Sequence, residues 1–297
     1  MLGKVLAFLT LNVSITSASY NVYNYDLSTP IFTPDGLLKQ VEYASEASSH
    51  SHPMIIVPFL IGNQSVIIMA TRNKSRRAQS RILQMPISQK SCGQSSLLVG
   101  INGVLSDCVS LLQVSRAEIQ SINCHGSPNI CTAMISFRQP LPSTQCAKRV
   151  AMSIADKCQQ HNFGGGIRCF GAEIVVCDCD QAVVFVTQPS GSITEYRSSI
   201  TGGELVVGGE KRKREQLYKL LQNKKSSLDM KQEAKNVDGL IRTMIKMIIG
   251  SMMELYDNDD DKSRGESLIE EFDLVIAHSS NGIVRIHGDR LMEVCNS

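Results

Sequence analysis

Several residue types that bind metals or act as nucleophiles occur in this chain, but their spacing forms no familiar site. The aspartate-rich stretch from Asp257 to Asp261 is similar to the start of a calcium-binding loop, which needs glycine at its sixth position and glutamate at its twelfth. Lys262 and Leu268 stand there instead, so we interpret the stretch as a solvated loop. The six histidines show no metal-ligand spacing on an expected helix. We therefore predict neither a metal site nor a cofactor.

The ten cysteines are scattered, and most of them stand in apolar runs. A disulfide scaffold is normally shorter and denser in cysteine, and no C-x-x-C pair of the zinc-binding kind occurs. Cys177 and Cys179 stand two residues apart in an expected strand, so both side chains point to the same face. We interpret them as packing residues in a protein of a reducing compartment.

The N-terminal segment and the net charge limit the compartments and the kinds of partner that we expect for this chain. Met1 to Ser19 has Lys4, an apolar run from Val5 to Leu11 and then small residues, which is the layout of a secretory signal peptide. The alternative is an N-terminal extension, residues 1–24, that stays attached.

No run of eighteen apolar residues occurs, so no transmembrane helix is expected. The formal net charge of +2 favours neither nucleic acid nor an anionic membrane as a partner. We interpret the basic run Lys211 to Arg214 as exposed surface rather than a nuclear import signal.

A capped amphipathic helix is predicted close to the N-terminus. Thr33 can serve as its N-cap, Pro34 suits the first helical position, and Asp35 places a carboxylate at the positive end of the helix. One apolar face recurs at helical spacing and must pack on another element; it consists of Leu37, Leu38, Val41 and Ala44.

The remaining elements alternate in groups of strands and helices. Gly62-Asn63 and Asn281-Gly282 predict two hairpins. This grouping favours a layered α+β fold over a parallel βαβ winding, and we expect residues 25–297 to form one domain. The expected strands are Met54 to Ile61, Gln64 to Ala70, Ser95 to Val99, Phe170 to Cys177, Ala182 to Thr187, Ser192 to Tyr196, Phe272 to Ala277 and Ile283 to Ile286. The further expected helices are Leu105 to Ile119, Ser143 to Gln160, Glu210 to Leu221 and Ala234 to Leu255.

The string from Tyr25 to Ala47 resembles the N-terminal signature of proteasome core alpha-type subunits, in the segments YD, F-T-P-D-G and L-x-Q-V-E-Y-A-x-E-A. Arg168 to Ala172 resembles the family's R-P-F-G-V strand opening, and Gln188 to Gly191 resembles its D-P-S-G turn. The similarity extends over about residues 25 to 290. The chain departs from the family pattern at Leu27, His52-Pro53 and Cys169.

The resemblance implies a four-layer αββα sandwich of the N-terminal nucleophile hydrolase type in a non-catalytic form. Catalytic beta subunits use an N-terminal threonine whose own amine is the base. Residues 48 to 64 contain no threonine. The resemblance therefore implies a structural and gating subunit of the proteasome outer ring, in ubiquitin-dependent protein degradation in the cytoplasm and nucleus. Its partners would be other alpha subunits in a seven-membered ring, the beta ring, and the C-termini of a regulatory particle or activator.

The resemblance also assigns site residues. Tyr25, Asp26, Pro34 and Tyr43 match the cluster that holds family gates open. Arg72 aligns with the family lysine that lines the pocket for activator C-termini. The alternatives are that Pro34 and Tyr43 serve only capping and packing, and that Arg72 is one more exposed charge beside Lys74, Arg76 and Arg77.

Two other functions stay open at this point. The chain could be a divergent paralogue outside the core particle, in a secretory or organellar compartment if Met1 to Ser19 is a cleaved signal. It could also be a hydrolase on the same fold, activated by processing that leaves a threonine, serine or cysteine at the mature N-terminus.

Overall fold

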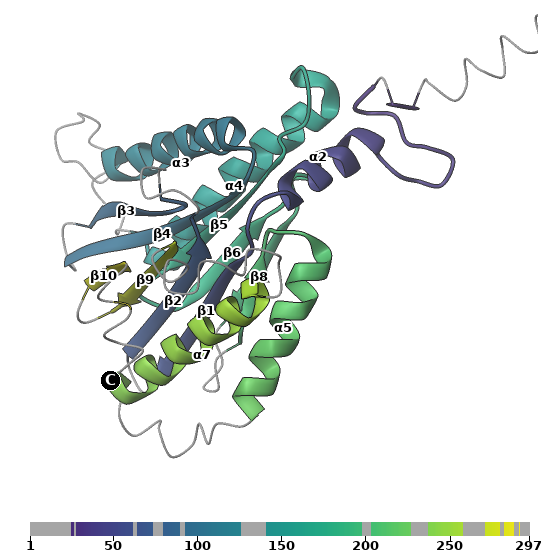
Figure 1. Cartoon of the computed structure of the whole chain (residues 1–297). Coiled ribbons are helices and arrows are strands. Elements are labelled where there is room, and N and C mark those ends of the chain that lie inside the picture. The colour runs from purple at the N-terminus through teal and green to yellow at the C-terminus, as the bar shows by residue number, and fades with distance from the viewer. Residues whose placement is uncertain are drawn as a thin grey trace, which may run out of the picture.

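In the computed structural model, two antiparallel sheets face each other, and helices cover their outer faces (Figure 1). The structure describes residues 25–26, 28–61, 64–73, 80–89, 93–125, 141–197, 203–226, 237–257, 271–279, 282–287 and 291. Residues 1–24, with the expected extension or signal, and the loop after Asp257 lie outside these ranges. The α+β sandwich architecture is as predicted.

The first sheet has the strand order β10-β9-β2-β1-β8. The hairpin predicted at Gly62-Asn63 is confirmed, because Ile61 pairs with Gln64 across it. The short strand β8 pairs with the first half of β1 and was not predicted. The strands are β1 (Met54–Ile61), β2 (Gln64–Arg72), β8 (Leu205–Val207), β9 (Phe272–His278) and β10 (Gly282–His287).

The second sheet has the strand order β3-β4-β5-β6-β7. Its edge strand β3 was also not predicted, because Pro86 in the middle of the run argues against a strand. The strands are β3 (Ile82–Gln89), β4 (Gly93–Gly103), β5 (Ala172–Asp178), β6 (Val183–Thr187) and β7 (Ile193–Arg197).

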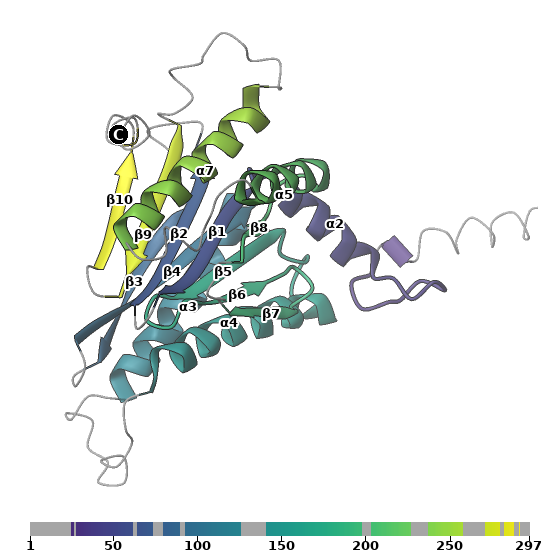
Figure 2. The same ribbon diagram turned by 90° about the horizontal axis from the view of Figure 1, so that it is seen from below.

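Helices form the two outer layers, as Figure 2 shows from below. The helices α3 (Leu105–His125) and α4 (Ser143–Gln160) cover the second sheet, and a π-helical turn, η1 (His161–Gly165), ends α4. The helices α5 (Lys211–Ser226) and α7 (Val237–Asp257) cover the first sheet. Helix α3 runs beyond the predicted end at Ile119 to His125.

The core is divided into three apolar layers by the alternation of side chains along the strands. In β2, Val66, Ile68 and Ala70 face α5 and α7, whereas Ile67 and Met69 face the second sheet.

The free cysteines Cys177 and Cys179 lie in the apolar layer between the two sheets. Cys177 is fully buried, with its sulfur 3.8 Å from the Met69 sulfur. Burial raises the pKa of the Cys179 thiol to about 12. The interpretation of both residues as packing residues is therefore confirmed.

The first helix begins later than predicted. Thr33 does not cap it: its hydroxyl accepts a hydrogen bond from the Leu37 N–H (3.1 Å), within a turn in which Gly36 has φ +78°. A residue in this left-handed region interrupts helical geometry. The helix α2 (Lys39–Ser49) therefore starts after the turn, behind Leu38 as its N-cap residue.

Within the described ranges, no helix combines the length and apolarity that a bilayer span requires. The same residues contain no group of three or more His, Cys, Asp or Glu side chains arranged to hold a metal ion.

Candidate functional site

Helix α2 lies across one end of the sandwich, beside β4 and β5 (Figure 1). Ala44 and Ser48 are its buried residues. Helix α2 packs closely against the segment that opens β5: a Cβ atom built on Gly171 would lie 3.1 Å from the Cβ of Ala47. Gly171 directly precedes β5, so the absence of a side chain there lets the helix approach the strand opening.

The outer face of α2 holds the first described residues of the chain. The Tyr43 hydroxyl donates a hydrogen bond to Asp26 Oδ1 (2.9 Å), and the Gln40 side-chain amide donates to the backbone carbonyl of Asp26. Tyr43 is half exposed, and the hydrogen bond to Asp26 raises the pKa of its phenol. Asp26 is therefore held through both its side chain and its backbone.

Two of the four predicted gate residues, Asp26 and Tyr43, are thus brought together. Tyr25 is partly buried and Pro34 is exposed in the turn before α2. Among the described residues, no hydrogen bond joins either of them to the Asp26–Tyr43 pair. Sequence reasoning missed Gln40, although its spacing of three residues from Tyr43 places both on one helix face.

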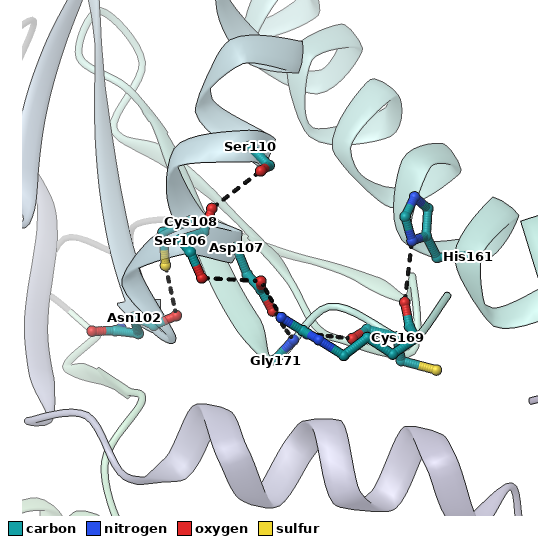
Figure 3. A network of polar contacts seen from close by, with 9 residues as sticks. Asn102, Ser106, Asp107, Cys108, Ser110, His161, Cys169 and Gly171 are labelled. Atoms are coloured by element: carbon teal, nitrogen blue, oxygen red, sulfur yellow. Dashed lines mark hydrogen bonds and ion pairs between the residues drawn. The ribbon is translucent and has the colours of Figure 1, made fainter. Parts of the chain in front are cut away.

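A second polar network ties the elements around α2 together (Figure 3). Asp107, in the first turn of α3, accepts two hydrogen bonds from the Arg168 guanidinium (2.6 and 2.7 Å) and one from the Gly171 N–H (2.9 Å). The Arg168 carbonyl in turn lies 3.1 Å from His161 Nδ1. The network joins the start of α3, the end of α4 and the opening of β5.

Asp107 is a buried carboxylate that keeps its charge. Burial acts to raise its pKa, but the hydrogen bonds from Arg168 and Gly171 together lower that pKa below the ordinary value. Sequence reasoning did not single out this pair, although the R-x-F-G similarity around Arg168 was the signal that could have found it.

The start of β1, where a nucleophile hydrolase of this fold would carry its nucleophile, consists of Pro53 and Met54. Both are buried, and Met54 packs between the two sheets with 0% exposure. The nearby Thr71 hydroxyl donates to the Pro53 carbonyl at 3.5 Å. The described residues thus present neither a hydroxyl nor a thiol at the first position of this strand.

A polar pocket of about 310 Å³ lies beside this strand start, between α2, the opening of β5 and the start of α5. Its Ser48 and Ser49 hydroxyls donate to helix carbonyls, each at 2.7 Å. The buried Glu173 carboxylate accepts a hydrogen bond from the Gly208 N–H (3.0 Å). Burial raises the pKa of Glu173, although the nearby Arg214 acts to lower it. These serines are engaged in backbone hydrogen bonds rather than paired with a base.

Arg72 ends β2 and is almost enclosed. Its Nε lies 2.8 Å from Glu271 Oε2, and only 8% of its side chain is exposed. Its guanidinium carbon lies 4.3 Å from the centre of the Tyr256 ring, a cation–π contact. The interpretation of Arg72 as one more exposed charge is therefore wrong. The comparison residues Lys74, Arg76 and Arg77 lie outside the described residues.

Comparisons with known proteins agree with this geometry. Residues 25–47 match the family model for the N-terminal signature of A-type proteasome subunits. The chain is 28% identical over 180 residues to the proteasome alpha subunit of Archaeoglobus fulgidus, covering 60% of this chain and 64% of the relative. It is 28% identical over 182 residues to the proteasome alpha subunit of Methanoculleus marisnigri, covering 60% and 66%. It is 24% identical over 228 residues to the proteasome alpha type-4-2 subunit of Oryza sativa subsp. indica, covering 75% and 82%. The matched region thus spans just under two thirds of the archaeal relatives' length.

Proposed function

The chain is a divergent proteasome alpha-type subunit, and from this premise we propose that it is a non-catalytic subunit of the outer ring of the core particle. In this role it packs beside other alpha subunits in a seven-membered ring and rests on the beta ring. Its cellular task is ubiquitin-dependent protein degradation in the cytoplasm and nucleus.

The start of β1 carries the non-catalytic part of the proposal. Threonine-type catalysis needs a hydroxyl at the mature N-terminus and a free amine on the same residue as the base. In this chain, Pro53 and the buried Met54 stand at that position, and the backbone runs into them from the end of α2 at Ser49 through residues 50–52. A cleavage before Met54 would release neither a hydroxyl nor a thiol.

The Asp26–Tyr43 pair supports a gating role. It fixes Asp26, the second described residue of the chain, on the outer face of α2, because Asp26 is bonded to two side chains of that helix. A segment fixed at one end can reach the axial pore with a defined origin. The Tyr43–Asp26 hydrogen bond stands at the surface, so it can break and reform at a cost of about 1 kcal/mol.

Arg72 is proposed, from its alignment with the family lysine, to contribute to the pocket that receives the C-terminal carboxylate of an activator. Arginine can pair a carboxylate through two parallel hydrogen bonds. The structure adds a condition to this role, because the guanidinium is already paired within the chain.

The decisive experiment is affinity purification of the tagged full-length chain from cells, followed by sizing of the native complex. We expect co-purification with beta subunits at the size of a core particle, and an intact N-terminal region by mass spectrometry. Recovery as a free chain, or with a mature N-terminus at a threonine, serine or cysteine, would overturn the proposal.

A further inference from the structure

The polar pocket between α2 and the start of α5 contains a buried carboxylate with one oxygen left to bond. Glu173 lines this pocket of about 310 Å³ and is only 7% exposed. Its Oε2 accepts the hydrogen bond from the Gly208 N–H (3.0 Å), whereas its Oε1 accepts none from the described residues. A buried carboxylate is costly unless donors or a cation reach it. The pocket therefore offers a place for a donor group at Glu173.

The α2 wall of the pocket also presents acceptors. Ser48 and Ser49 line it, and each hydroxyl already donates its proton to a helix carbonyl at 2.7 Å. Their oxygens therefore have only lone pairs to offer a ligand. The exposed Glu46 adds a second carboxylate to the lining. Glu173 and this wall thus suit a cationic donor such as a primary ammonium group.

The first turn of α5 lines the same pocket with positive charge. Lys211 and Arg214 contribute to the lining, and neither forms an ion pair with another described residue. Arg214 is near enough to act on the pKa of Glu173, yet the two side chains form no salt bridge. Cationic side chains at a helix N-terminus repel the helix dipole unless an anion joins them. A guanidinium pairs a carboxylate through two parallel hydrogen bonds, so this part of the pocket suits a carboxylate.

We propose that this pocket binds a small zwitterion of amino-acid or dipeptide size, with its ammonium on Glu173 and its carboxylate on Arg214. Such a ligand satisfies both charges at once, whereas a simple anion would meet Glu173 as a like charge and a polyamine would meet Arg214 as one. The proposed site does not depend on the outer-ring role of the chain.

The backbone around the pocket is already held in place. Gly208 and Gly209 lead into α5 with φ of +70° and +73°. A Cβ atom on Gly208 would lie 2.6 Å from the side chain of Asn102, and one on Gly209 would lie 2.8 Å from Pro53. Because this turn is closely packed, the Gly208 N–H that orients Glu173 is fixed before a ligand enters.

The test measures binding of dialanine by ligand-observed NMR to the full-length chain as it is isolated, with any threonine-type peptidase sites in its complex blocked by an inhibitor. Two further probes each lack one charge: N-acetyl-dialanine has no ammonium, and dialanine amide has no carboxylate. We expect saturable binding of dialanine, and binding of each further probe about tenfold weaker, because each loses a hydrogen-bonded charge pair.

Two variants assign the two ends of the ligand. Glu173→Gln, which keeps an acceptor oxygen for the Gly208 N–H, should weaken dialanine binding about tenfold and remove only the preference over the acetylated probe. Arg214→Gln, at a half-buried position, should weaken it similarly and remove only the preference over the amide. The matched controls are Glu215→Gln and Arg212→Gln, exposed neighbours on α5 outside the pocket lining, and they should leave binding unchanged.

The outcomes that overturn the proposal are distinct. Absence of saturable dialanine binding would show a pocket that holds solvent only. Equal binding of dialanine and its acetylated form would indicate an anion site, and equal binding of dialanine and its amide would indicate an amine site; either result refutes a zwitterion site. Equal losses in the control variants would show that the effects arise outside this pocket.

Discussion

Removal of Arg168 should destabilise the chain, because the polar network beside α2 is built around the buried carboxylate of Asp107. In the wild-type chain, Asp107 is buried and Arg168 is the more exposed partner, with side-chain exposures of 7% and 57%. Arg168→Ala leaves the Asp107 carboxylate with the Gly171 N–H bond and without its cation. We expect burial, the largest influence on this group, then to outweigh the remaining hydrogen bonds from Gly171 and Ser106 and to raise the pKa of Asp107 above the ordinary value of 3.8.

The size of the effect follows from the two exposures. The ion pair itself contributes at most about 1 kcal/mol, because the guanidinium is mostly in water. The buried carboxylate that loses two hydrogen bonds adds about 1–3 kcal/mol. We therefore expect Arg168→Ala to lower the free energy of unfolding at pH 7 by about 2–3 kcal/mol. Asp107→Asn in the Arg168→Ala background removes the buried charge and should restore part of that loss.

The pH dependence gives an independent check by urea denaturation. The wild-type pKa of Asp107 lies below 3.8, so its contribution is complete at neutral pH and is lost as the pH falls through the folded-state pKa. In Arg168→Ala the folded-state pKa lies above 3.8, so stability falls as the pH rises through that interval. The deficit should thus be smaller at pH 4.5 than at pH 7. An equal deficit at both pH values, or further destabilisation by Asp107→Asn at pH 7, would refute the reasoning.

Four further outcomes are expected. Tyr43→Phe should speed deuterium exchange at residues 25–30 and reduce activator-stimulated peptide hydrolysis at an unchanged Tm; unchanged stimulation would count against the gate assignment. Burial places the pKa of Glu173 above 4.5, so its contribution to stability declines as the pH rises past that value, and Glu173→Gln should flatten the pH dependence of urea midpoints. The thiols of Cys158 and Cys179, with pKa values raised to about 12 by burial, should resist iodoacetamide at pH 8 until urea is added; mass spectrometry counts the adducts. The purified chain should not hydrolyse fluorogenic peptides, and turnover blocked by a threonine-directed inhibitor would contradict this.

Elements with a strong local pattern were predicted well from the sequence. The helix α4 has the predicted bounds, Ser143–Gln160, because apolar residues recur along it at helical spacing and a glycine run ends it. The strand β8 was missed because it has only three residues and because its partner strand, β1, lies about 150 positions earlier in the chain. The strand β3 was missed although Leu83, Met85 and Ile87 alternate with less apolar residues, because Pro86 within the run argues against a strand.

The candidate site likewise has a part that the sequence predicted and a part that it did not. The string around Tyr43 placed Asp26 and Tyr43 in one cluster, and the structure joins them across 17 residues. The partner of Arg72 stands 199 residues away, and no local pattern announces Glu271. Pairing across such a separation depends on the register of β2 against β9, which local periodicity does not determine. The charge of Arg72 was therefore predictable, but its burial was not.

Helix α2 connects the two halves of the proposed function. Its inner face covers the sandwich end through Ala44 and Ser48, while its outer face holds Asp26 through Gln40 and Tyr43. Changes on the outer face should therefore alter gating without disturbing the core. Changes on the inner face should lower stability without creating catalysis, because Met54 at the start of β1 has neither a nucleophilic side chain nor a free amine within the chain. A large inner-face substitution such as Ala44→Phe thus separates the roles: we expect a lower Tm, no peptidase activity, and gating loss only in proportion to unfolding. Peptide hydrolysis by this variant would show that the buried strand start is reactive and that the division of α2 into two faces is wrong.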